Sequence, residues 1–104
     1  KEDGALDFGW TAQAVHDRVR AMHPWPGAYT TDRGERLKVH RSRMVDPKGS
    51  HGEPGRVLGV GEDGLRVACA TGVVALSEVQ QPGRKRLAAE AYALGRGTPE
   101  RLGA

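Results

Sequence analysis

Basic side chains are the residues of this sequence whose types and spacing could do chemistry. Residues 36–104 hold 12 Lys and Arg against 7 Asp and Glu, whereas residues 1–35 hold 4 against 6. A basic face attracts phosphate groups without reading a sequence, because neutralised phosphates release their condensed counterions. The net charge is only +3, so an ordinary solvated surface is the alternative interpretation. Two basic clusters stand out, one on a predicted strand (Lys38, Arg41, Arg43) and one in a predicted loop (Arg84, Lys85, Arg86).

The other reactive residues form no constellation suited to catalysis or metal binding. The four histidines show neither H-x-x-x-H nor H-E-x-x-H spacing, and a single cysteine cannot complete a four-ligand zinc set. Cys69 ends an alternating apolar run, which favours a small core residue over a nucleophile. Residues 59–64 spell G-x-G-x-x-G, but a dinucleotide site needs a helix afterwards, and the alternation that follows predicts a hairpin strand. We therefore expect no catalytic, cofactor or metal site.

The elements that must position the basic clusters are one helix followed by five strands. Gly accounts for 15 of 104 residues, which is typical of short strands joined by tight turns. Thr11 is a candidate helix N-cap, and Val15, Val19 and Met22 then recur on one helical face. Periodicity predicts strands at 28–30, 36–45, 55–60, 65–69 and 73–79, a short helix at 87–94, and a loose surface tail from 96 to 104.

The apolar alternation of the long strand changes phase in its middle. The first half has apolar residues at odd positions, whereas Met44 in the second half lies at an even position. Because a one-residue slip exchanges the two faces of a strand, we predict a β-bulge near His40 and Arg41. The bulge would turn Arg41 and Arg43 outward, as Lys38 already is. One outer face would then carry three cations.

An elbow at residues 23–30, HPWPGAYT, joins the helix to the first strand. Pro24 disfavours helical geometry in the residue before it, so the helix should end at His23, and Gly27 permits the sharp turn. Trp25, held between two prolines, is a rigid aromatic anchor. We expect it to plug the core where helix meets sheet, with a base-stacking role as the alternative.

Four segments, in order along nearly the whole chain, resemble the C-terminal domain of the methionyl-tRNA formyltransferases. The elbow resembles the segment that opens that domain. The other three are LDFGW at 6–10, which resembles the family's "I-D-W", GEPGRVL at 52–58, which resembles "pGxVL", and VQQPGRKRL at 79–87, which resembles "lQxxGKKxM". Arg84 and Arg86 stand where the family often has Lys, which keeps the charge and adds a forked donor suited to phosphate.

This resemblance implies a fold and a division of the chain. The fold is mainly β, a five-stranded open Greek-key barrel of the OB type, preceded by one α-helix and followed by a short helix. Residues 1–9 would be a linker segment and residues 10–104 the barrel domain, with the N-terminal catalytic domain outside this chain. Periodicity alone does not separate such a barrel from an SH3-like one, so the topology rests on the resemblance.

The resemblance also implies a role. The family's catalytic domain transfers a formyl group from 10-formyltetrahydrofolate to initiator methionyl-tRNA, so this chain alone would not catalyse the transfer. We expect it to grip the tRNA backbone through the six residues of the two basic clusters, because A-form RNA is read largely by shape and backbone. Its partners would be the tRNA and the catalytic domain. We expect a cytoplasmic location, since no signal peptide or long apolar run is present, and we expect a monomer.

Three other functions remain as alternatives. The domain could come from a related formyltransferase that acts on a nucleotide sugar or on folate, although the loop at 79–87 argues against this. It could be a free-standing single-strand-binding module, which would need exposed aromatic residues on its sheet. It could also brace a catalytic domain, which would need an exposed apolar patch.

Overall fold

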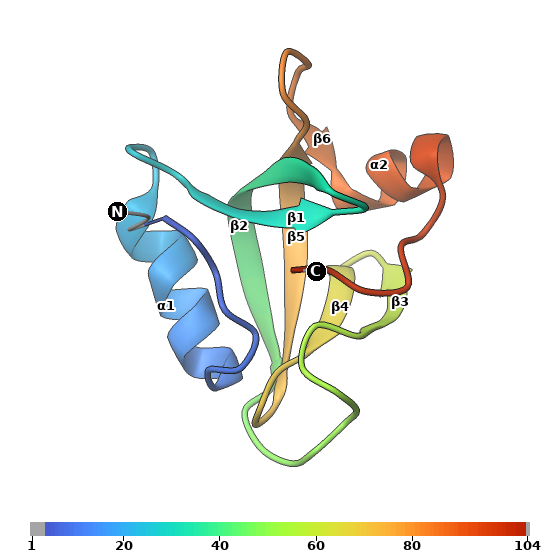
Figure 1. The fold of residues 1–104 in the computed structure, drawn as a ribbon. Helices are drawn as coiled ribbons and strands as arrows, with labels where there is room; N and C mark the ends of the chain where they lie inside the picture. The colour runs from blue at the N-terminus through green and yellow to red at the C-terminus, as the bar shows by residue number, and fades with distance from the viewer. Residues whose placement is uncertain (1–3, 104) are drawn as a thin grey trace.

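A computed structural model describes residues 4–103, which form an antiparallel sheet flanked by two helices (Figure 1). The elements in chain order are α1 (Ala12–Met22), β1 (Ala28–Asp32), β2 (Glu35–Asp46), β3 (Val57–Gly61), β4 (Gly64–Ala68), β5 (Val73–Gln80), β6 (Leu87–Ala88) and α2 (Ala89–Arg96). The strand order is β1-β2-β5-β4-β3, and β6 pairs with β5. The predicted mainly β class with a helix at each end is therefore confirmed. Within the described residues the sheet is open and has six strands rather than five.

The connections between the strands follow a Greek key. β3, β4 and β5 are joined by short turns, whereas β2 lies beside β5 and connects by the long loop at 47–56 to β3 at the far edge. The G-x-G-x-x-G segment forms the β3–β4 hairpin, in which Gly61 pairs with Gly64, as predicted. Gly64 has a φ of +123° and is packed against the backbone of Leu76, where a side chain would not fit.

The predicted bulge in the long strand is present. Val39 pairs with Val79 and Arg41 with Glu78, so His40 is the extra residue on β2. Lys38, Arg41 and Arg43 are all exposed, as the phase change predicted. Further register shifts follow near Ser42 and before Asp46. The bulge thus allows one strand to bury Leu37 and Val39 in its first half, to pack the partly buried Met44 against the core in its second half, and still to present its cations to solvent.

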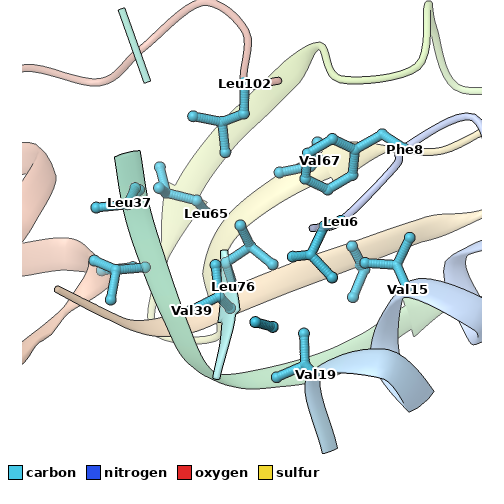
Figure 2. Packing of buried hydrophobic residues seen from close by; sticks show 14 of the residues in the cluster. Leu6, Phe8, Val15, Val19, Leu37, Val39, Leu65, Val67, Leu76 and Leu102 are labelled. Atoms are coloured by element: carbon cyan, nitrogen blue, oxygen red, sulfur yellow. The ribbon is translucent and has the colours of Figure 1, made fainter. Parts of the chain in front are cut away.

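The core lies between α1 and the sheet. Thr11 caps α1 by accepting a hydrogen bond from the Ala14 backbone N–H at 3.1 Å, as its position predicted. Val15 and Val19 are fully buried and point from α1 into the apolar cluster, and Met22 packs against it (Figure 2). The same cluster includes Leu6, Phe8, Leu37, Val39, Leu65, Val67, Val74, Leu76, Val79, Tyr92 and Leu102. Its periodic members were predictable from the sequence.

The prediction of a loose tail after residue 96 is wrong. Leu102 is only 3% exposed and donates its backbone N–H to the Gly55 carbonyl at 2.8 Å. The neighbouring Gly103 N–H donates to the Thr31 carbonyl at 2.8 Å. The short helix also begins and ends two residues later than predicted, because residues 87–88 pair with β5 as β6. The buried Leu102 side chain and these two backbone hydrogen bonds therefore hold the segment after α2 against the rest of the fold.

The prediction that Trp25 plugs the core is also wrong, since its side chain is 83% exposed. The Gly27 N–H donates to the Met22 carbonyl at 2.8 Å and closes the elbow, which leaves Trp25 at its tip. Leu6 and Phe8 occupy the junction between helix and sheet instead. Both side chains are buried, at 9% and 4% exposure.

A buried polar cluster fastens α2 to the turn between β1 and β2. The Asp32 carboxylate is 1% exposed and accepts hydrogen bonds from the Arg33 guanidinium at 2.8 and 3.0 Å and from the Tyr92 hydroxyl. Arg33 also donates to the carbonyls of Arg96 and Gly97 at the end of α2. Burial raises the pKa of Asp32, but the hydrogen bonds from Arg33 and Tyr92 and the nearby positive charges outweigh it, so the pKa lies below its ordinary value.

Segments near the ends of the described chain pair with part of each edge of the sheet. At β1, the Leu6 N–H donates to the Tyr29 carbonyl at 2.9 Å, and the Tyr29 N–H donates to the Gly4 carbonyl at 2.8 Å. At β3, the Val57 N–H donates to the Glu100 carbonyl at 2.9 Å. In the part of the chain that the structure describes, neither helix is long and apolar enough to cross a membrane.

Candidate nucleic-acid interface

A groove of about 440 Å³ lies between α1 and the strands β2 and β5, and we call it the basic groove. Its walls come from the second half of α1, from the bulged stretch of β2 and from one residue of β5. The lining residues are His16, Val19, Arg20, His23, His40, Arg41, Ser42, Arg43 and Ser77. None of these lining residues is acidic. The groove thus concentrates positive charge in a concave surface, as an anion-binding site requires.

The bulge and the helix together bring the charges of the groove near one another. Arg41 and Arg43 follow the bulge on β2, and Arg20 reaches the groove from the last turn of α1. Arg20 stands outside both basic clusters that the sequence predicted, so its place in the groove was missed. His16, Arg20 and His23 recur at i, i+4 and i+7, which is the spacing of one helical face. That polar stripe was the signal that could have found them.

Three histidines line the groove beside its arginines and serines. His16 Nδ1 lies 2.7 Å from Ser42 Oγ, which ties α1 to β2 by a hydrogen bond. His40 Nε2 lies 2.7 Å from the side-chain amide oxygen Oε1 of Gln80, and its ring meets the His23 ring edge-on at 5.8 Å. Burial, together with the nearby Arg86 and His23, lowers the pKa of His40 despite its hydrogen bond to Gln80. His40 is therefore neutral at pH 7 and donates to Gln80.

Glu78 links the strand cluster to the loop cluster. Its carboxylate lies 3.6 Å from Arg41 Nε and 4.0 Å from a terminal nitrogen of Arg86. One carboxylate between two guanidinium groups leaves a net positive charge, and both arginines are at least half exposed. The loop that carries Arg86 projects beyond the end of the sheet, at the top of Figure 1. The structure therefore brings Arg86 to the edge of the basic groove, next to Arg41.

The remaining predicted site residues lie outside the basic groove. Lys38 shares a face with Arg41, since their partners on β5 are two residues apart, but it borders a separate depression of about 160 Å³. Arg84 lines a third depression of about 300 Å³ together with Arg96, on the side of α2. Lys85 is exposed and lines none of these three hollows. Of the six predicted residues, the structure gathers Arg41, Arg43 and Arg86.

Comparisons with known proteins agree with this architecture. The family model described as "Formyl transferase, C-terminal domain" matches residues 1–97. A methionyl-tRNA formyltransferase of Heliobacterium modesticaldum is 45% identical over 103 residues, which cover 92% of this chain and 33% of that protein. The methionyl-tRNA formyltransferase of Thermus thermophilus is 46% identical over 97 residues, which cover 93% of this chain and 31% of that protein. The chain spans about a third of the length of these curated relatives.

A solved structure shares the fold. The crystal structure of HypX from Aquifex aeolicus in complex with tetrahydrofolic acid aligns with a TM-score of 0.72 at 17% identity, covering 86% of this chain and 16% of that chain. At this identity the likeness concerns the fold alone. The family match over 97 residues and the relatives at 45–46% identity confirm the resemblance carried by the four sequence segments. The chain belongs to the formyltransferase C-terminal domain family.

Proposed function

We propose that this chain is the tRNA-binding domain of a methionyl-tRNA formyltransferase and that its basic groove holds the tRNA backbone. The observation that carries the proposal is the groove itself, in which Arg20, Arg41 and Arg43 converge and no lining residue is acidic. The names of the relatives support tRNA as the substrate.

Arginine suits this task. A guanidinium group presents a planar fork of donors that matches two phosphate oxygens and keeps its charge at any physiological pH. Contacts of this kind fix the position of an A-form helix without reading its bases. The groove should therefore bind tRNA weakly, in a salt-sensitive way, and with little discrimination between tRNAs. Lys38, Arg84 and Lys85 would add contacts on either side of the groove.

The parent enzyme would use this grip to place its substrate. We propose that a catalytic domain outside this chain transfers the formyl group from 10-formyltetrahydrofolate to the methionyl amine, in the cytoplasm and as a monomer. The contribution of this chain would be positional, since binding energy from remote parts of a substrate can orient the reacting centre. The groove lies on a rigid sheet and helix, which suits such a role.

A salt series of binding measurements tests the proposal. Fluorescence anisotropy of labelled initiator and elongator tRNAs would be followed with the wild-type chain and with Arg41→Ala/Arg43→Ala. The matched control is Arg56→Ala/Arg101→Ala, which removes the same charge beside β3 at the far edge of the sheet. Each lost phosphate contact lowers the slope of log K against log salt by about one. We expect a fall of about two for the groove variant and a much smaller change for the control.

The outcomes separate the candidate functions. Similar binding of both tRNAs, with the flatter slope confined to the groove variant, would support a generic tRNA grip at this groove. Equal slopes for the groove and control variants would mean that only the overall charge matters, and the groove assignment would be wrong. Absence of tRNA binding at low salt would refute the RNA role, and the nucleotide-sugar and bracing functions would then be preferred.

A further inference from the structure

We propose that Trp25 is a stacking platform for one unpaired base of the RNA that lies in the basic groove. The inference rests on the proposed function and extends it from the phosphate backbone to the bases. It assigns a ligand, a single-stranded nucleotide, to a residue that the fold does not use. It also predicts that this domain senses unpaired segments of an RNA rather than double helix alone.

The first argument is that the indole is presented rigidly to solvent. Trp25 is 83% exposed, whereas Trp10 is partly buried with the Arg18 guanidinium 4.9 Å from its ring centre. Pro24 and Pro26 fix the backbone dihedral on both sides. The elbow is closed by the hydrogen bond to the Met22 carbonyl, and Met22 itself packs against the core. Because this backbone is already constrained, stacking of a ligand on Trp25 costs little further backbone freedom.

The second argument is the position of the ring beside the groove. His23 is the lining residue at the end of α1, and only Pro24 separates it from Trp25. Two residues of chain span at most about 7 Å, so the tip of the elbow lies near that end of the groove. A strand whose phosphates meet Arg20 and Arg41 could therefore turn a neighbouring base toward the indole.

The third argument concerns the chemistry around the ring. A protein-docking patch needs contiguous apolar surface, yet the other large apolar side chains that are exposed lie on β2 (Val45), β3 (Leu58) and α2 (Leu94). The chain neighbours of Trp25 are Pro24 and Pro26 instead, and His23, one residue further back, lines the groove that also holds Arg20 and Arg41. Exposed aromatic rings next to a cationic groove are the combination that binds single-stranded nucleic acid, because every base has a face that can stack.

Tryptophan fluorescence gives a direct test. The chain has two tryptophans, so Trp10→Phe leaves Trp25 as the single reporter. The probes are an RNA stem-loop and a blunt RNA duplex with the same number of phosphates. We expect the stem-loop to quench Trp25 and the duplex to bind without quenching. If Trp10→Phe impairs folding, the difference in quenching between the wild-type chain and Trp25→Phe gives the same information.

Affinity measurements separate this inference from the proposed function. Trp25→Ala should weaken binding of the stem-loop and of tRNA on the order of tenfold, with an unchanged salt slope, because stacking releases no counterions. The Trp25→Phe variant should recover part of the loss. The duplex should bind Trp25→Ala as tightly as it binds the wild-type chain.

Several results would overturn the stacking role. If Trp25→Ala binds tRNA normally while Arg41→Ala/Arg43→Ala flattens the salt slope, the groove assignment stands and the stacking role is wrong. Equal quenching by the duplex would show that the ring does not need an unpaired base. A shift of Trp25 emission with protein concentration, in the absence of RNA, would mean that a second copy covers the ring. If no RNA binds, both proposals fail together.

Discussion

Replacing the buried carboxylate of Asp32 by an amide is the sharpest test of what holds α2 against the turn between β1 and β2. Asp32→Asn keeps the volume and an acceptor for Tyr92 but removes the charge and turns an amide N–H toward Arg33. Hydrogen bonds to a charged group contribute about 1.5–3 kcal/mol each. The Arg33 side chain is 43% exposed, so solvent screening reduces the free energy that its bonds to Asp32 contribute. We expect the free energy of unfolding to fall by about 2–3 kcal/mol.

The pH dependence of this loss gives the prediction a second, independent readout. The pKa of Asp32 lies below its ordinary value, so the ionised form stabilises the folded state. That stabilisation is complete above the pKa of an unfolded Asp, about 3.9, and disappears as the pH falls through the lower pKa of the folded state. The difference between wild type and Asp32→Asn should therefore be largest near neutral pH and shrink toward about pH 3.

Urea unfolding followed by circular dichroism at both pH values measures the effect. For a domain of this size, about 2 kcal/mol lowers the melting temperature by roughly 10 °C, so thermal melts give a check. Asp17→Asn is the matched control, because Asp17 is exposed and bonds only to Gln13 in the described structure, and its change should stay within about 0.5 kcal/mol. A loss below about 1 kcal/mol, or an equal loss at low and neutral pH, would refute the reasoning.

Two further predictions concern packing. Gly64→Ala would drive a β-carbon into the Leu76 carbonyl at a φ of +123°, so urea unfolding should show a loss of about 3 kcal/mol or more. Gly95→Ala, at a helical position with open space around it, should instead stabilise the fold by about 0.5–1 kcal/mol, and equal effects at both glycines would contradict the structure. Burial raises the pKa of the Cys69 thiol to about 11, so mass spectrometry should find iodoacetamide labelling only after unfolding. Rapid labelling of the native chain would show that the thiol is accessible.

The features that the sequence predicted well are those with a local cause. The α1 stripe follows from a spacing of three and four residues, and its N-cap at Thr11 from a single side chain. The bulge follows from a change of apolar phase within β2. Proline and glycine mark the elbow in the same way. Each of these signals lies within about a dozen residues of the structure it describes.

What the sequence did not predict depends on which residues meet across the fold. Trp25 is exposed, whereas Leu6, Phe8 and Leu102 from the two ends of the described chain are buried in the core. Arg20 belongs to the groove only because α1 crosses β2 beside the bulge. The periodicity of residues within one helix or strand does not indicate which residues of other elements they will contact. The family resemblance supplied the basic loop but did not distinguish Arg86, at the groove, from Lys85.

The backbone hydrogen bonds at the two edges of the sheet limit the ways in which this domain can bind a partner. An edge strand with unpaired backbone groups can pair with a strand of another chain, which leads to aggregation, domain swapping or amyloid. Here the backbone groups near both edges are engaged by the segments around Leu6 and Glu100. Main-chain pairing with a partner is thereby discouraged. Recognition falls to side chains on the open surfaces, which can change charge and shape through mutation while the scaffold beneath them stays the same.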